Sequence, residues 1–338
     1  MSALSSIEWT DATWNPVTGC TKVSAGCKNC YAEGVAKRFW GDRKFGDVVC
    51  HDDRLDQPLR WRKPRRVFVN SMSDLFHEDV PDEFIDIVFG VMGNAPEHTF
   101  QILTKRPGRM REWFKRVESM PRSPRMHTGY AACCSEAGLR MPIAPMQNWP
   151  YPNVWLGVSV ENNEQMDRVC DLAETPAAVR FVSMEPLLEH VDMNIGPHGD
   201  FRSWKCSECG SRNVDPEVFH FPDDMATWLC DDCGSHGQPG EDAPSTSLID
   251  WVIVGGESGP GARPCEVKWI RSIIEQCRSA GVACFVKQLG ADVRTHAWHC
   301  GSSFVPGHVP PRIKLKSRKG SDPTEWPEDL RVREFPGA

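Results

Sequence analysis

The sequence predicts an α/β fold, either a full or a partial (β/α) barrel, and three observations lead to this prediction. Short apolar runs rich in β-branched residues alternate with longer segments of helical periodicity. The apolar runs are almost continuous, which is typical of parallel strands buried on both faces. About six strand–helix units follow one another, and one more strand is expected before them, so the pattern favours a barrel over an open sheet.

The elements of this pattern can be placed along the chain. We expect a first strand within residues 9–18 and a first helix over residues 32–39. The later strands are expected at Arg66–Asn70, Thr99–Thr104, Asn153–Val160, Val179–Met184, Asp250–Gly255 and Ala283–Gln288. The later helices are expected at Asp82–Met92, Arg109–Val117, Glu164–Leu172 and Lys268–Ala280. Polar residues end each of these strands, so we expect a polar cavity at the carboxyl edge of the sheet.

Three segments interrupt the alternation and divide the chain. The barrel is expected to comprise residues 1–196 and 247–309. Residues 122–150 are rich in Pro, Met and Arg and indicate a long loop or a small insert. Residues 197–246 hold a second group of cysteines and indicate a separate insert. Residues 310–338 form a charged, Pro-containing tail that we expect to wrap the outside or to be partly mobile.

Composition and charge exclude several classes of protein. The chain of 338 residues has 39 basic and 46 acidic residues, and its net charge of −7 argues against non-specific coating of nucleic acid. A local basic patch stays possible. No apolar run reaches the roughly 18–20 residues of a membrane helix, and the N-terminus does not resemble a signal peptide. We therefore expect a cytoplasmic protein without a membrane partner, whose 15 cysteines are more suited to metal than to disulfides.

The first cysteine group occupies the loop of residues 19–32, which follows the first predicted strand. Its sequence has the spacing C-x6-C-x2-C, formed by Cys20, Cys27 and Cys30. Three thiolates on one short loop suit a metal centre with an open coordination position. Gly19 and Gly26 permit the backbone turns that such a loop needs. The alternative is a zinc site completed by His51 or Cys50, which we leave open here together with free thiols.

These residues carry a resemblance to known proteins. A three-cysteine loop after the first strand of an α/β barrel, closing with C-x-x-C-Y, resembles the cluster motif of radical S-adenosylmethionine (SAM) enzymes, although their commonest first gap is three residues rather than six. The chain also resembles an uncharacterised phage and bacterial family of three-cysteine-motif proteins. The matching segments are Trp14–Cys20 (WNPVTGC), Ser71–Phe76 (SMSDLF), Leu103–Pro107 (LTKRP) and Trp326–Arg333 (WPEDLRVR).

The resemblance implies a barrel of radical SAM type and a cofactor set. Cys20, Cys27 and Cys30 would bind three irons of a [4Fe–4S] cluster, and SAM would bind the fourth. An electron from an external donor would then split SAM into methionine and a 5′-deoxyadenosyl radical that attacks a substrate. The cofactor-binding residues that we predict lie at strand ends, where contacts to SAM or substrate would form: Asn70, Ser71, Ser73, Ser159, Glu161 and Glu185.

The second cysteine group predicts a zinc ribbon within residues 197–246. Cys206, Cys209, Cys230 and Cys233 have the spacing C-x2-C-x20-C-x2-C, which is close to that of closed, structural zinc sites. A rubredoxin-type iron site or an auxiliary cluster would use the same four sulfurs. The segment is acidic, so it gives little support to nucleic-acid binding by the ribbon itself.

Three functional hypotheses follow from the sequence. The first is a radical SAM-like enzyme whose substrate is unknown. The second is a nucleic-acid-modifying or repair enzyme of the same type, supported by basic residues at Lys105, Arg106, Arg109, Arg111 and the tail segment 312–319 but not by the net charge. The third is a non-enzymatic zinc-binding scaffold in which both cysteine groups are structural.

The two cysteine groups are expected to act independently. A small ribbon has little hydrophobic core, so bound zinc supplies much of its folding free energy. Replacing Cys230 with Ser should therefore lower the zinc content and the thermal stability while leaving the iron content unchanged. Metal analysis of the purified variant checks this. Parallel loss of iron would show that the two sites depend on each other.

Overall fold

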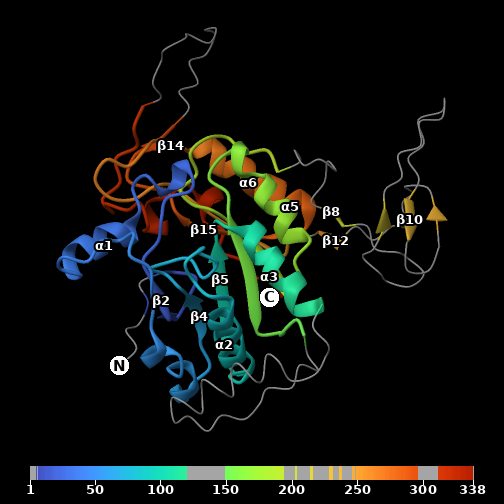
Figure 1. Ribbon diagram of the computed structural model, residues 1–338. Helices are drawn as coiled ribbons and strands as arrows, with labels where there is room; N and C mark the ends of the chain where they lie inside the picture. Colours follow the sequence, from blue (N-terminus) through green and yellow to red (C-terminus); the bar gives the residue numbers. More distant parts are fainter. Residues whose placement is uncertain are drawn as a thin grey trace.

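The computed structural model describes residues 5, 7–119, 149–193, 249–295 and 311–337, and the backbone of five short strands between 202 and 247. Its centre is a seven-stranded sheet in which all neighbours are parallel (Figure 1). In spatial order the strands are β1 (Ala12–Trp14), β4 (Arg66–Val69), β5 (Thr99–Thr104), β6 (Val154–Ser159), β7 (Val179–Met184), β13 (Trp251–Gly255) and β15 (Ala283–Gln288). The expected α/β class and the expected strands are confirmed.

The sheet is curled into part of a barrel. Its order begins at β1 and ends at β15, and these two edge strands are not paired with each other. The Trp9 ring lies 4.8 Å from Phe68 of β4, 6.5 Å from Phe181 of β7 and 6.2 Å from Trp251 of β13, measured between ring centroids. Strands from both halves of the sheet thus reach one ring. Of the two architectures predicted from the sequence, a full or a partial barrel, the structure has the partial barrel.

The C-terminal tail lies along the β15 edge of this partial barrel. The Val286 amide donates to the Val332 carbonyl at 2.8 Å, and the Glu334 amide donates to Cys284 at 2.8 Å. Phe335 then packs on Trp251, with ring centroids 5.2 Å apart, and the Arg66 guanidinium at the start of β4 lies 4.3 Å from the Phe335 ring centroid. The tail therefore links the two sides of the curled sheet.

Helices alternate with the strands along the chain. They are α1 (Tyr31–Phe39), α2 (Asp82–Gly93), α3 (Pro107–Ser119), α5 (Asp167–Ala173) and α6 (Val267–Ala280). Local sequence explains their ends: α2 starts with acidic residues after Pro81, and α6 ends at Gly281, whose φ of 66° suits a glycine C-cap. The apolar sides of α2, α3, α5 and α6 pack with the strands in one large core. Within the described ranges, no helix combines the length and apolar character needed to cross a membrane.

The insert between β7 and β13 has its own small sheets. β8 (Arg202–Ser203) pairs antiparallel with β12 (Thr246–Ser247), so the insert starts and ends side by side. Between them, β9 (Val214–Asp215), β10 (Trp228–Cys230) and β11 (His236–Gly237) form an antiparallel sheet, drawn apart from the parallel sheet in Figure 1. Cys206, Cys209 and Cys233 lie outside the described residues, as does the side chain of Cys230 and most of the expected loop 122–150.

Close packing inside the curl gives a stability prediction. A Cβ atom on Gly157 of β6 would lie 2.4 Å from the buried Phe181 ring of the neighbouring strand. Gly157→Ala should therefore lower the free energy of unfolding by about 1–3 kcal/mol, because the ring must move within a filled core. Gly34→Ala is the matched control: its Cβ meets nothing within 4 Å on α1, and it should stabilise by about 0.5–1 kcal/mol. Urea unfolding measures both, and equal stabilities would contradict this packing.

Candidate functional site

A cavity of about 620 Å³ lies at the carboxyl edge of the sheet, where the sequence predicts a polar site. Its wall combines the cysteine loop with residues that follow the strands. Among the predicted site residues, those that line it are Cys20, Cys27, Cys30, Asn70, Ser71, Ser73, Ser159 and Glu185. The parallel arrangement explains this gathering, because strand ends distant in sequence meet at one edge.

The residues that follow β4 hold the start of the cysteine loop. Gly19 forms a bridge with Ser73, and the Gly19 amide donates to Met72 at 3.0 Å. The Ser73 hydroxyl donates to Val17 at 2.8 Å. Gly19 has a φ of 99°, and a Cβ atom there would lie 2.3 Å from the Asp47 carbonyl oxygen, so glycine is required. Ser73 thus has a structural contact in addition to its place in the cavity wall.

Glu161 lies behind the cavity wall and is fully buried. Its carboxylate is 2.6 Å from Lys105 Nζ and 3.2 Å from Arg168 Nη1. The Ser24 hydroxyl is 3.3 Å from both carboxylate oxygens, and a Cβ atom on Gly26 would collide with this side chain. The predicted ligand contact is therefore a buried anchor for the cysteine loop, and Lys105 is the member of the group that lines the cavity.

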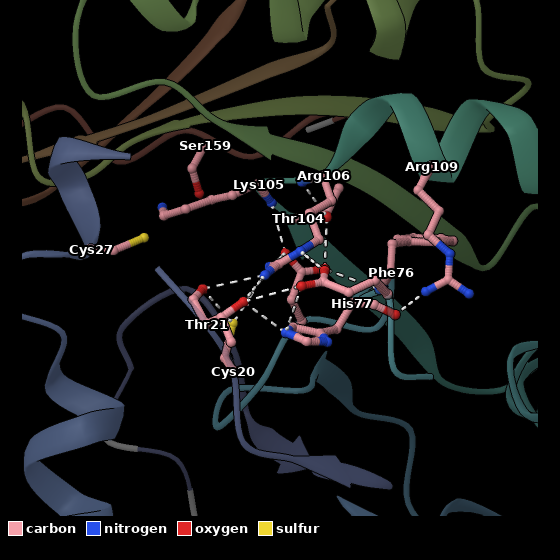
Figure 2. A network of polar contacts seen from close by, with 12 residues as sticks. Cys20, Thr21, Cys27, Phe76, His77, Thr104, Lys105, Arg106, Arg109 and Ser159 are labelled. Carbon is pink, nitrogen blue, oxygen red and sulfur yellow. Dashed lines mark hydrogen bonds and ion pairs between the residues drawn. The ribbon is translucent and has the colours of Figure 1, made fainter. Parts of the chain in front are cut away.

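Arg106 connects the first cysteine to the end of β5. Figure 2 shows its guanidinium reaching Cys20 and Thr21, with Nη1 3.5 Å from Cys20 Sγ and Nη2 2.7 Å from Thr21 Oγ1. The buried Asp74 carboxylate lies 3.3 Å from Arg106 Nη1 and accepts a hydrogen bond from Thr104 Oγ1 at 2.7 Å. Burial and, to a lesser degree, Asp74 raise the pKa of the Cys20 thiol to about 11, although Arg106 opposes this shift.

The cysteine loop supplies a set of donors that an iron–sulfur cluster could use. In the described part of the chain, no three His, Cys, Asp or Glu side chains are grouped as ligands of one metal ion. A zinc ion with Zn–S bonds of about 2.3 Å needs its sulfurs within roughly 4 Å of each other. Cysteines of a cluster bind different irons and lie farther apart. Three thiols at the mouth of one cavity (Cys20, Cys27 and Cys30) could therefore hold a [4Fe–4S] cluster with one open iron.

The proposed zinc alternatives lie elsewhere. His51 Nε2 is 2.7 Å from Thr18 Oγ1, and Cys50 is in β3 (Val49–Cys50), paired with Val17 of β2 (Val17–Thr18). Neither side chain is part of the cavity lining that the structure describes. A zinc ion shared by the three cysteines and one of these residues thus receives no support from the geometry.

Asn70 is the most unusual residue of the cavity wall. It is the non-glycine residue with positive φ among those described, at 61°, and it is 2 % exposed. Its Oδ1 accepts a hydrogen bond from the Val17 amide at 3.2 Å, while its Nδ2 has no partner within the described structure. A buried amide donor without a partner costs about 1–3 kcal/mol, and backbone strain of this kind is typical of ligand sites.

Contacts between residues distant in sequence complete the site, and no local pattern predicts which residues pair. Glu257, after β13, accepts hydrogen bonds from Asn29 Nδ2 at 2.9 Å and from Arg263 Nε at 3.0 Å. Arg263 Nη1 also donates to the Ala25 carbonyl at 2.8 Å, so this pair ties the cysteine loop to the far half of the sheet. Lys319 of the tail also lines the cavity, although we expected the tail to be outside it.

The Glu257 contacts predict a pH dependence. Burial alone would raise the pKa of Glu257, but hydrogen bonds from Arg263 and Asn29 hold it below its usual value. A lowered carboxyl pKa contributes stability above the unfolded pKa of about 4.3 and loses it as pH falls through the folded pKa. Glu257→Gln should therefore reduce the free energy of unfolding by about 1.5–3 kcal/mol at pH 7, and by less as the pH approaches 3.

The measurement is urea unfolding of both proteins across this pH range. Glu118→Gln on the exposed side of α3 removes the same charge without these contacts, and it should follow the unmodified chain at every pH. A Glu257→Gln deficit that persists unchanged at acid pH would show that the charge of Glu257 is not the cause.

Comparison with known proteins adds a family but no activity. The model of the family described as "Protein of unknown function (DUF5131)" matches residues 4–320. This range includes the cysteine loop, the seven strands of the parallel sheet and the insert. No curated protein matches the chain, and no solved structure does. Because the match extends over most of its length, the chain belongs to the DUF5131 family.

Proposed function

We propose that this chain is a radical SAM-like [4Fe–4S] enzyme. The observation that carries the proposal is the position of Cys20, Cys27 and Cys30, which line a cavity of about 620 Å³ at the carboxyl edge of a curled parallel sheet. Active sites of (β/α) barrels lie at this edge. When bound, the cluster and SAM together supply a 5′-deoxyadenosyl radical that removes hydrogen from a substrate.

The protein positions the cluster through the cysteine loop. The three thiols are the ligands, and the contacts of Glu161, Ser73 and Glu257 hold the loop at three places. The high pKa of Cys20 means that this thiol is protonated at neutral pH until it binds metal, so cluster binding releases its proton. Arg106 then lies beside a thiolate, where its positive charge is favourable.

Charged groups of both signs in the cavity wall support a zwitterionic ligand. The wall includes the cations Lys105 and Lys287 and the anion Glu185, and Lys287 Nζ lies 3.2 Å from Glu185. SAM has a carboxylate, an amino group and a sulfonium, and it can pair with both kinds of side chain. The free Asn70 amide and the hydroxyls of Ser71, Ser73 and Ser159 supply neutral donors and acceptors. These residues, with Glu185, are our candidates for SAM contacts.

The cavity is large enough to enclose a ligand. At about 620 Å³ it is within the range of pockets that enclose a drug-sized ligand. Apolar side chains at its walls, including Phe68 and Leu103, exclude water from the deeper part. Exclusion of water prevents side reactions of a reactive intermediate.

Anaerobic purification tests the proposal. The unmodified chain should contain about four irons and matching sulfide, and the EPR signal of the dithionite-reduced protein should change when SAM is added. Cys27→Ser and Cys30→Ser should each lose most of the iron, because each removes a ligand that no neighbouring side chain replaces.

Cys50→Ser is the matched control, since Cys50 is outside the cavity lining and should leave the iron content unchanged. Formation of 5′-deoxyadenosine from SAM is the next assay. Zinc alone, without iron after anaerobic reconstitution, would overturn the proposal in favour of a zinc-binding scaffold.

A further inference from the structure

The apolar surface of the described chain is concentrated beside the cysteine loop. All of its exposed large hydrophobic residues fall within residues 23–49: Val23, Tyr31, Val35, Phe39 and Val49. Three of them, at Tyr31, Val35 and Phe39, are spaced four residues apart on α1 and form one stripe, the α1 ridge, while Ala32 and Ala36 face the core. An exposed apolar stripe of this kind marks an interaction site.

The α1 ridge leads into the cavity. Tyr31 and Val35 line its wall, and Phe39, which is 72 % exposed, continues the stripe away from it. The Tyr31 hydroxyl donates to the Ser71 carbonyl, so its ring is held at the rim. Figure 1 shows α1 standing away from the other helices. A ligand that lies along the ridge therefore reaches the cysteines at its end.

A row of basic side chains forms a second part of this rim. Residues 312–319 include Arg312, Lys314, Lys316, Arg318 and Lys319, all exposed, and no acidic residue. The first four alternate with less exposed residues, and the chain turns at residues 316–320. Lys319 lines the same cavity as Tyr31. This is a concentrated positive charge in a chain whose net charge is −7.

The basic residues between positions 105 and 111, which also indicated nucleic-acid binding, already form ion pairs within the protein. Lys105 pairs with Glu161, Arg106 with Asp74, Arg109 with Asp82, and Arg111 with Asp171 and Glu174. In contrast, Lys314, Arg318 and Lys319 form no ion pair with another described residue. The charge available to an external partner is therefore on the tail segment and not on the strand-end residues.

We infer that the α1 ridge and the basic row bind a single strand of nucleic acid and direct one of its bases into the cavity. Aromatic side chains that stack on bases, next to a positive groove that follows the phosphates, are the usual means of binding single strands. The bases must be unstacked to reach such a ridge, which excludes an intact duplex. A globular acidic protein fits the charge equally well, but it would cover the cavity mouth to which both surfaces lead.

This inference names the substrate class of the proposed enzyme and, to that extent, rests on the proposed function. Binding itself needs no cluster. It can therefore be measured on the full-length Cys27→Ser chain as well as on the unmodified one, and a failure of binding is distinguishable from a failure of the iron proposal.

The probe is a fluorescein-labelled single strand of DNA with mixed sequence and about 20 nucleotides. This length exceeds the about 4–16 nucleotides of usual single-strand sites. The RNA strand of the same sequence and the DNA duplex are measured in parallel. Fluorescence anisotropy should show binding that weakens with salt. The triple variant K314Q/R318Q/K319Q should reduce the slope of log K against log salt by about 2, because each lost phosphate contact contributes about 0.7. Phe39→Ala should weaken single-strand binding roughly 5- to 150-fold.

The control variant K115Q/R278Q removes two exposed charges from α3 and α6 and should bind like the unmodified chain. The inference would be overturned if neither DNA nor RNA bound at low salt, or if the duplex bound as tightly as the single strand. It would also be overturned if K314Q/R318Q/K319Q and Phe39→Ala bound like the control variant. Binding of an acidic flavodoxin that Phe39→Ala abolishes, without binding of either strand, would instead assign the ridge to an electron donor. A preference between DNA and RNA identifies the polymer.

Discussion

A buried carboxylate with two cationic partners holds the cysteine loop in place. Glu161 follows β6 and contacts Lys105, Arg168 and Ser24, while Gly26 packs directly against it. A charge this deeply buried is stable only when it is paired and hydrogen-bonded. The need to satisfy Glu161 thus fixes the distance between the loop and the sheet. The cysteine loop, Lys105 and Glu161 therefore form one unit, although they come from three separate segments of the chain.

Much of the fold was predictable because the residues of a buried strand are themselves apolar, so each strand can be identified from its own short segment of sequence. A run such as Trp251–Gly255 is apolar on both faces, and this pattern indicates a parallel strand regardless of its neighbours. The gathering of Cys20, Cys27 and Cys30 at one cavity was predictable for the same reason, since their spacing is local. Whether the sheet closes was not, because closure depends on contacts such as Trp9 with Trp251, which are far apart in sequence.

The roles of individual site residues were less predictable. Both Glu161 and Asn70 are predicted as ligand contacts, but Glu161 lies outside the cavity lining, whereas Asn70 lines the cavity with an amide nitrogen that has no partner among the described residues. Both are polar residues at strand ends, and only the surroundings of each side chain in the folded protein distinguish their positions relative to the cavity. The hydrogen bond between Asn29 and Glu257 joins residues 228 positions apart, and no local pattern marks it. The position of the tail along β15 likewise depends on contacts between segments that are distant in sequence.

The placement of residues 332–335 also has a consequence for synthesis. These residues pair with β15 and put Phe335 against Trp251 and Arg66, at the open side of the curl. The ribosome makes them after all seven strands of the sheet. The nascent chain must therefore emerge with the aromatic interior of the curl uncovered on one side. Until residues 332–335 are in place, the Trp251 and Phe285 rings lack their contact with Phe335.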